Sequence, residues 1–311
     1  MIAVFVDWGS TNFRAYLVEL RCQIEGSARP KLCVLDSVAT GRGVLTIEQG
    51  QFADVLEETL APWSLPAGTL VLLAGMAGSQ LGWRETPYVP TPVSIHQLSH
   101  GLLSVPSRFD WHVEFVPGIR YDGQRYDSQD VMRGEEVLAL GSEIENGIVC
   151  LPGTHSKWLT LSQGEVASFK TFMTGELYQL LTAHSSLQSV TSELGFVPQA
   201  FNDGVSKKGH LSNELFGVRA KVLTGHMDLA DGASYLSGLL IGQEFDYFLD
   251  QQAQMNLTGL AGRLYIVSEG VLLNRYQQAC EYFELDYQLV DSEQCFIHGM
   301  YQLVLARGNV S

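Results

Sequence analysis

The fold of this chain is decided near its start, by the sequence Val4-Phe5-Val6-Asp7-Trp8-Gly9-Ser10-Thr11-Asn12-Phe13-Arg14-Ala15-Tyr16-Leu17. A short apolar run rich in β-forming residues stops at a polar turn that contains Gly9. A second apolar run follows at once, from Phe13 to Leu20. Two such runs around a polar glycine turn are typical of a β-hairpin.

The same pattern returns in the second half of the chain. Aligning Gly9 with Gly153 places Ile148-Val149-Cys150 on the first apolar run and Gly153-Thr154-His155-Ser156 on the first turn. The returning strand is Trp158-Leu159-Thr160-Leu161. Two glycine-hydroxyl turns, one in each half, can bind a polyphosphate from both sides, because glycine lets backbone N–H groups approach closely. Two ordinary hairpins built from turn-forming residues are the alternative.

Apolar spacing predicts the remaining elements. We expect strands at Thr69–Ala74 and 265–267, and helices at 47–61, 133–141, 175–186, 212–224, 231–252 and 271–284. The proline-containing residues 86–92 should be loop or edge structure, and 117–129 a polar connection. Strands that alternate with helices indicate an α/β fold. We expect two domains, residues 1–129 and 130–311, with a cleft between them.

Composition excludes several classes of function. The 311 residues contain 34 acids and 19 bases, a formal charge of −15. Such a chain lacks the excess of cations that binding to nucleic acid or to an anionic membrane requires. The start has no secretory pattern, and no apolar stretch approaches the ~20 residues that span a bilayer. The five cysteines form no CxxC pair, so neither a disulfide framework nor a zinc site is predicted. We therefore expect a cytoplasmic protein.

Several blocks in order along the chain resemble one family. Asp7-x-Gly9-x-Thr11-Asn12 and Gly153-Thr154 resemble the two phosphate motifs of the actin/hexokinase/Hsp70 ATPase superfamily. The wider series resembles the 2-dehydro-3-deoxygalactonokinase family, in these blocks: Asp7–Ala15, Ala74–Ser79 with Gly82-Trp83, Asp130–Glu136, Pro152–Trp158, Met173–Leu177, Leu236–Gly242 and Arg275–Ala279. The resemblance implies a two-domain actin-like (ribonuclease H-like) fold. It also implies ATP- and Mg²⁺-dependent phosphorylation of the 6-hydroxyl of 2-dehydro-3-deoxy-D-galactonate, in galactonate catabolism.

The resemblance and the residue types together give candidate roles. Asp7, at the end of the first strand, is the expected Mg²⁺ ligand, through water. Glu135 takes the place of the catalytic base of carbohydrate kinases, with Glu136 and Asp130 as alternatives. Nucleotide contacts are expected from Gly9, Ser10, Thr11, Asn12, Gly153, Thr154, His155, Lys157, Gly238 and Gly270. The late turn, Val267–Val271, departs from the family pattern, and Gly270 meets the same backbone need one residue later.

The substrate is a carboxylate, so a cation should face it. Arg14, Arg133 and Lys157 are the candidates. Further substrate contacts are expected from Gly75, Met76, Gly78, Ser79 and Trp83, which follow a predicted strand.

Three classes of function remain open from the sequence. The leading hypothesis is a sugar-acid kinase, acting on the galactonate compound, on its gluconate epimer or on another sugar acid. The second is a non-catalytic actin-like protein that binds sugar or nucleotide, and the third is a phosphatase-like member that transfers to water. The partner is a small molecule in each case. The oligomeric state stays open, a homodimer included.

Overall fold

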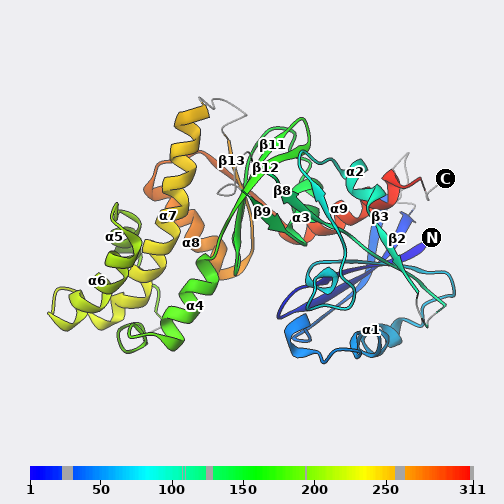
Figure 1. The fold of residues 1–311 in the computed structure, drawn as a ribbon, viewed down its shortest axis with the longest axis horizontal. Coiled ribbons are helices and arrows are strands. Elements are labelled where there is room, and N and C mark those ends of the chain that lie inside the picture. The colour runs from blue at the N-terminus through cyan, green and yellow to red at the C-terminus, as the bar shows by residue number, and fades with distance from the viewer. Residues whose placement is uncertain are drawn as a thin grey trace. The chain divides into compact units, whose positions relative to one another are not determined.

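The computed structural model describes residues 1–22, 31–106, 108, 110–123, 129–192, 195–255 and 263–308 (Figure 1). These residues divide into two compact units. Unit 1 consists of residues 1–145, 161–169 and 292–311, and unit 2 of residues 146–160 and 170–291. Unit 1 therefore extends past residue 129 and includes the C-terminal segment, whereas we expected a single boundary between residues 129 and 130.

The main sheet of unit 1 has the strand order β3-β2-β1-β4-β7-β6. Its strands are β1 (Ile2–Trp8), β2 (Phe13–Cys22), β3 (Lys31–Thr40), β4 (Leu70–Ala74), β6 (Leu103–Val105) and β7 (His112–Phe115). β1 and β2 form the predicted hairpin, with Asp7 opposite Arg14 and Trp8 opposite Phe13. β1 also runs parallel to β4, which runs parallel to β7. The carboxyl ends of these three strands consequently lie at one edge of the sheet.

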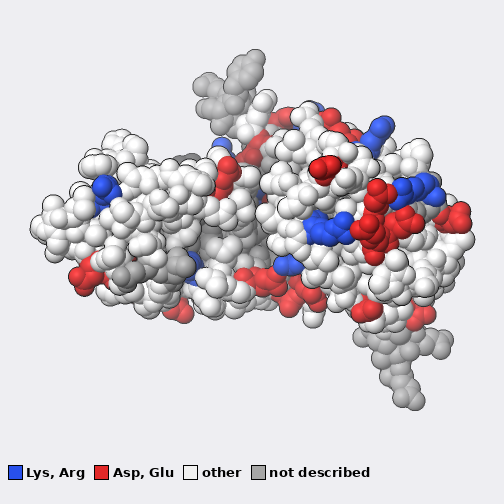
Figure 2. Space-filling model, turned by 90° about the horizontal axis from the view of Figure 1, so that it is seen from below, with Lys and Arg blue, Asp and Glu red and all other residues white. Residues whose placement is uncertain are grey.

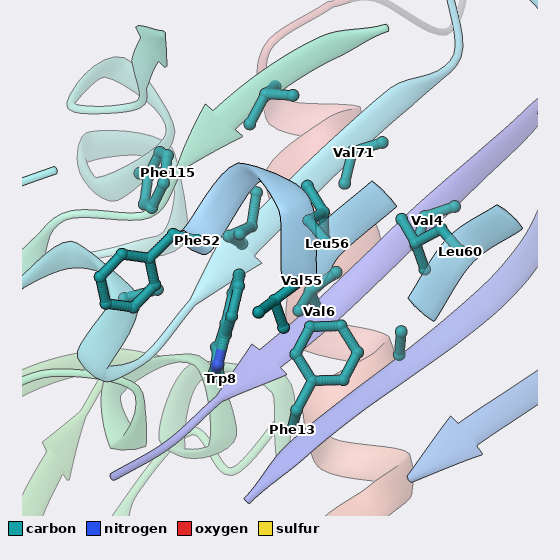
Figure 3. Packing of buried hydrophobic residues seen from close by; sticks show 14 of the residues in the cluster. Val4, Val6, Trp8, Phe13, Phe52, Val55, Leu56, Leu60, Val71 and Phe115 are labelled. Carbon is teal, nitrogen blue, oxygen red and sulfur yellow. The ribbon is translucent and has the colours of Figure 1, made fainter. Parts of the chain in front are cut away.

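Period-two alternation divides the side chains of β1 between two buried faces. Val4, Val6 and Trp8 belong to a core that includes Phe13 and the helix α1 (Phe52–Leu60). Figure 3 shows Trp8 within this core, where its ring lies 4.9 Å from that of Phe13 and 5.6 Å from that of Phe52. Each such fully buried side chain contributes about 1.5–3 kcal/mol to folding. The strand residues on both sides of the turn at 9–12, Trp8 and Phe13, are therefore fixed by the core.

A second, smaller sheet of unit 1 has the order β5-β8-β9. Its strands are β5 (Tyr88–Pro90), β8 (Gly118–Tyr121) and β9 (Asp130–Met132). β5 lies at an edge, as the prolines of 86–92 predicted. The predicted connection 117–129 is wrong in part, because Gly118–Tyr121 pairs with strands on both sides. Residues 124–128 lie outside the described residues.

The C-terminal helix α9 (Ser292–Ala306) completes unit 1 by packing against α3 (Glu135–Gly141). The contact is close because both helices carry a glycine there. A Cβ on Gly141 would lie 2.0 Å from the carbonyl oxygen of Cys295, and one on Gly299 would lie 2.3 Å from that of Val137. This packing places α3 in unit 1, outside the domain in which we expected it. Unit 1 also contains α2 (Ile95–His100) and the short 3-10 helices Val44–Thr46, Ala61–Trp63 and Met76–Gly78.

The sheet of unit 2 has the order β12-β11-β10-β13-β14. Its strands are β10 (Gly147–Leu151), β11 (Ser156–Ser162), β12 (Glu165–Phe172), β13 (Leu264–Val267) and β14 (Tyr287–Val290). As in unit 1, the second strand pairs with the first and the third pairs with the second, here β11 with β10 and β12 with β11. On the other side of β10, β13 pairs parallel with β10 and β14 pairs parallel with β13. Numbered in chain order within each sheet, the strands run 3-2-1-4-6-5 in unit 1 and 3-2-1-4-5 in unit 2. The shared order 3-2-1-4 supports the duplication that the two turns predicted.

The helices of unit 2 agree with the expected ones to within a few residues. They are α4 (Thr174–His184), α5 (Pro198–Val205), α6 (Leu211–Leu223), α7 (Gly232–Met255) and α8 (Gly270–Tyr282), with 3-10 turns at Gln188–Val190 and Leu229–Asp231. The short helix α5 is the one that apolar spacing did not predict. It packs on α7, because glycines on both helices permit backbone contact.

The described cysteines differ in their bonding state. Cys33 is disulfide-bonded, which the cysteine spacing did not predict, whereas Cys150, Cys280 and Cys295 are free and buried. No helix within the described ranges combines the length and apolar character that crossing a bilayer requires. On the face drawn in Figure 2, basic side chains lie among acidic ones. Among the ion pairs of unit 1, Arg108 pairs with Asp54 and Glu57.

Candidate functional site

The first phosphate turn joins β1 to β2 and is closed by its own backbone. The N–H of Gly9 donates to the carbonyl of Asn12 at 2.9 Å. The carbonyls of Gly9 and Ser10 accept from the N–H groups of Val44 and Leu45, both at 3.0 Å. Thr11 and Asn12 are exposed. The turn therefore offers hydroxyl and amide donors to a ligand while its carbonyls are occupied on the protein side.

A support behind this turn was missed by sequence reasoning. A Cβ on Gly43 would lie 2.2 Å from the carbonyl carbon of Thr11, so only glycine fits against the turn. The indole Nε1 of Trp8 donates to the carbonyl of Arg42 at 2.9 Å, which fixes the same segment. The closely spaced glycines Gly41 and Gly43 were the available signal, but a glycine pair alone indicates only a turn.

Three segments of unit 1 meet beside Asp7. Asp7 pairs with Ala74 across the parallel strands, so Gly75 follows directly beside it. Gly75 has φ +91°, and a Cβ there would lie 2.8 Å from the carbonyl oxygen of Trp8. Gly134, with φ +108°, packs on Gly75, since its Cβ would lie 3.1 Å from the Gly75 Cα. The structure thus brings the ends of β1 and β4 and the start of α3 together.

The acidic pair at the start of α3 divides into two environments. Glu135 is half-buried, and its carboxylate accepts from the N–H of Arg133 at 3.2 Å. Glu136 is fully buried, and its Oε2 accepts from the N–H of Gly134 at 2.7 Å. Burial, together with the charge of Glu135, raises the pKa of Glu136 to about 8. Glu136 is therefore largely protonated at neutral pH, whereas Glu135 is accessible.

Arg133 is buried, with 7% of its surface exposed. Its guanidinium donates to the Thr86 hydroxyl and, at 2.9 Å, to the Thr86 carbonyl. It also stacks on the Tyr88 ring, with 4.4 Å from Cζ to the ring centroid. Gly78 lies against the same guanidinium, since a Cβ there would be 3.1 Å from Nη1. Arg133 thereby positions the loop that follows β4.

The other predicted residues of unit 1 have separate surroundings. Met76 and Gly78 bound a 3-10 helix, and the Ser79 hydroxyl is buried with no hydrogen-bond partner among the described residues. Trp83 packs on Phe115, with its ring 5.6 Å away. Asp130 lies in β9, where its carboxylate accepts from the Val131 N–H at 2.8 Å.

The second phosphate turn, in unit 2, is held by the start of α4. A Cβ on Gly175 would lie 2.5 Å from the carbonyl oxygen of Gly153, and the N–H of Glu176 donates to the carbonyl of Thr154 at 3.0 Å. The Nε2 of His155 lies 2.5 Å from the Glu176 carboxylate. Lys157 is 3% exposed, and its ammonium donates to the His155 carbonyl at 2.9 Å. The turn is thus fixed from two sides.

A pocket of about 270 Å³ opens beside this turn. Its lining comes from the turn and from α4, α7 and α8: Gly153, Thr154, Thr174, Gly175, Tyr178, Gln179, Ser237, Leu240, Ile241, Val271, Leu272, Arg275 and Tyr276. A mostly apolar cavity with a few polar groups and a glycine-hydroxyl turn at one end can bind a nucleotide.

Two predicted nucleotide contacts lie near this pocket without lining it. Gly238 packs on α5, because a Cβ there would be 2.0 Å from the carbonyl oxygen of Phe201. Its neighbour Ser237 lines the pocket instead. Gly270 begins α8 with φ +64°, and the following residues, Val271 and Leu272, form part of the lining. Both glycines therefore shape the elements that carry the lining residues.

A buried carboxylate that sequence reasoning missed connects the pocket walls. Glu244, on α7, accepts from Trp158 Nε1 at 2.6 Å, from Tyr276 Oη at 2.8 Å and from the Thr174 hydroxyl. Tyr276 Oη also lies 2.7 Å from Ser156 Oγ. Burial raises the pKa of Glu244. The signal in the sequence was an acid between the apolar residues Ile241 and Phe245.

Comparison with known proteins bears on both units. The 2-keto-3-deoxy-galactonokinase family profile matches residues 7–303. The chain is 32% identical over 306 residues to the "Probable 2-dehydro-3-deoxygalactonokinase DgoK1" of Rhizobium meliloti (strain 1021), covering 95% of this chain and 94% of that protein. It is 31% identical over 316 residues to the "2-dehydro-3-deoxygalactonokinase" of Escherichia coli (strain K12), covering 98% of each.

Solved structures agree with the sequence relatives. The "Crystal structure of a putative 2-dehydro-3-deoxygalactonokinase protein from Sinorhizobium meliloti" matches with a TM-score of 0.83 at 31% identity, covering 99% of this chain and 96% of that one. A dehydratase activator from Clostridium difficile matches with a TM-score of 0.50 at 11% identity, covering 99% of this chain and 97% of that one, and shares the fold alone. The two-domain actin-like fold is thereby confirmed. The chain belongs to the 2-keto-3-deoxy-galactonokinase family, and the kinase predicted from its motifs is confirmed with it.

Proposed function

We propose that this protein transfers the γ-phosphoryl group of ATP to the 6-hydroxyl of 2-dehydro-3-deoxy-D-galactonate. The observation that carries the proposal is the pocket beside Gly153 and Thr154, because it joins a phosphate-binding turn to a nucleoside-sized cavity. Family membership supplies the substrate class. The ATP γ-phosphoryl oxygens would bring negative charge to turns that offer N–H and hydroxyl donors, as phosphoryl transfer requires.

Glu135 is the base in this proposal. A general base must be ionised and must reach the hydroxyl proton. Glu136 meets neither requirement, since its pKa is raised to about 8 and its carboxyl group is buried. Glu135 is more exposed and adjoins the loop at Gly75 through Gly134. Glu136 then has the role of fixing Gly134 by its hydrogen bond.

The carboxylate of the substrate would face Arg14. Arg14 lies opposite Asp7 on the strand pair that carries the first turn. Arg14 is half-buried, whereas Arg133 and Lys157 are buried at 7% and 3% exposure and donate to the Thr86 carbonyl and the His155 carbonyl. We therefore assign Arg133 to positioning the loop and Lys157 to stabilising the second turn.

Magnesium is part of the proposal through the nucleotide. Within the described residues, no three His, Cys, Asp or Glu side chains come together as a metal site. Mg²⁺ that arrives with ATP needs only one or two carboxylates, because phosphate oxygens and water complete its shell. Asp7, at the carboxyl end of β1, has the right donor chemistry, and Mg²⁺ would neutralise phosphate charge there.

The test is ADP production by the purified protein with Mg-ATP. It is run without a sugar acid, with 2-dehydro-3-deoxy-D-galactonate and with the gluconate epimer. ADP release with the galactonate compound alone supports the proposal, and release with the epimer alone keeps the kinase but changes the substrate. ADP without any sugar acid indicates hydrolysis, and no ADP under any condition indicates a binding protein.

The base is tested by Glu135→Gln, which should lower kcat by at least ~10²-fold while KM changes little. Glu145→Gln is the matched control, because Glu145 is an exposed acid of the same unit. Turnover within tenfold of the wild type in the Glu135 variant would exclude Glu135 as the base.

A further inference from the structure

Arg275 differs from every other described residue that lines the pocket, because it alone is charged. Its Nη1 is buried and has no hydrogen-bond partner among the described residues. No described carboxylate forms an ion pair with it, and burial lowers its pKa. The chain as a whole is strongly acidic. Because Arg275 lines a cavity and its Nη1 has no hydrogen-bond partner among the described residues, we expect a ligand to interact with its guanidinium.

The guanidinium of Arg275 contacts an aromatic ring that is not part of the pocket lining. Its Cζ lies 4.9 Å from the centroid of the Phe196 ring. Phe196 does not line the pocket and is itself packed on Phe201, with their rings 5.6 Å apart. The aromatic contact therefore helps to fix the orientation of the planar cation, which itself lines the cavity.

The position of Arg275 along the pocket separates it from the phosphate turn. Gly175 contacts the turn, and Tyr178 and Gln179 follow one helical turn later, about 5–6 Å along α4. Arg275 interacts electrostatically with Tyr178. It thus lies at the level of the second turn of α4, where the nucleoside would lie if the phosphates bound Gly153 and Thr154.

We propose that Arg275 binds the nucleoside of the nucleotide, by stacking its guanidinium plane on the purine base. A guanidinium stacks on aromatic faces and needs no counter-charge to do so. The apolar side chains of Leu240 and Ile241, on α7, line the same cavity and suit a flat base. The inference rests on the proposed use of ATP and adds the residue that distinguishes a nucleotide from a bare polyphosphate.

The experiment compares ADP with inorganic pyrophosphate, by calorimetry and without turnover. Arg275→Met keeps the aliphatic stem and Arg275→Lys keeps the charge without the plane. Both should weaken ADP binding about tenfold and leave pyrophosphate binding within about twofold. KM for ATP should rise by the same factor, with kcat and KM for the sugar acid unchanged. Arg219→Ala, an arginine of α6 that bonds Ser186 and Ser189, is the matched control.

The outcomes separate the two proposals. If the wild type binds no ADP, the proposed function fails. If the wild type binds ADP and the Arg275 variants bind it equally well, the role of Arg275 is refuted. If the Arg275 variants bind ADP and pyrophosphate more weakly by the same factor, Arg275 is a phosphate ligand, and its proposed role in binding the nucleoside is refuted. A measurement on the wild type needs no variant: ADP, but not pyrophosphate, should protect Arg275 from phenylglyoxal, read by mass spectrometry.

Discussion

Replacing Glu136 by glutamine should stabilise unit 1, and the gain should grow with pH. The carboxyl group is fully buried, and its pKa is raised from 4.5 to about 8. Below the unfolded pKa the group is protonated in both states and costs nothing. Between the two values the unfolded chain releases a proton that the folded chain keeps. Wild-type stability then falls by about 1.4 kcal/mol per pH unit. Above pH 8 the loss is complete.

The size of the effect follows from the two pKa values. Their difference of 3.5 corresponds to an upper bound of about 5 kcal/mol, of which about 3 kcal/mol is reached at pH 7. Glutamine cannot ionise, and its carbonyl oxygen can still accept the N–H of Gly134. The stability difference between variant and wild type should therefore increase by about 4 kcal/mol from pH 5 to pH 8.

Urea unfolding at pH 5, 6, 7 and 8 measures this difference. Tryptophan fluorescence reports mainly on unit 1, which contains Trp8, Trp63, Trp83 and Trp111. Glu145→Gln, at an exposed acid, should show no trend with pH. A difference for Glu136→Gln that stays constant over the same range would refute the reasoning. The single variant Glu135→Gln should lose less stability between pH 5 and pH 8 than the wild type does. The charge of Glu135 is the second cause of the raised pKa of Glu136, and the variant removes it.

Three further predictions concern residues that hold the two turns. Gly75→Ala should cost about 2–3 kcal/mol in urea unfolding, because the residue has φ +91° and its Cβ would lie 2.8 Å from the Trp8 carbonyl oxygen; Gly50→Ala, at φ +94° with open space around it, should cost less than half as much. Gly175→Ala should raise KM for ATP at least ~tenfold, because it displaces α4 from the second phosphate turn by contact with the Gly153 carbonyl; an unchanged KM would show that the turn tolerates the shift. Glu244→Ala should lower stability by about 3–5 kcal/mol in thermal unfolding, because two buried donors, Trp158 and Tyr276, and the half-buried Thr174 hydroxyl lose their acceptor; a loss below about 1 kcal/mol would mean that water replaces the carboxylate.

Local patterns predicted the two hairpins and most of the long helices. The similarity of the turns at Gly9 and Gly153 predicted that the first strands of the two units have the same arrangement. The two hairpins are encoded by adjacent residues, so a sequence alone reveals them. The pairing of β4 with β7 and of β10 with β13 joins segments distant in the chain, which no local period records. The same limit explains the domain boundary, because the packing of Gly141 on Cys295 joins residues far apart in the chain.

The candidate site could be predicted as a set of segments but not as a set of roles. Neighbouring acids at a helix start look alike in a sequence, and only burial separates Glu135 from Glu136. Arg133 is a candidate carboxylate ligand in the sequence, and only the folded geometry shows that its guanidinium donates to Thr86. Glu244 and Gly43 act through partners distant in sequence, so their importance lies in the folded geometry.

The helix α9 has a consequence for how the protein is made. Unit 2 lies between residues 145 and 292, so the chain that forms it is synthesised before unit 1 is finished. Until α9 leaves the ribosome, the surface of α3 that Gly299 contacts is uncovered, and Tyr16 lacks its partner Glu293. Residues 1–145 can therefore complete the packing of unit 1 only after residues 292–311 have been synthesised. A nascent chain stopped short of residue 292 would carry every residue that lines the pocket of unit 2, together with a unit 1 whose uncovered apolar surface favours aggregation.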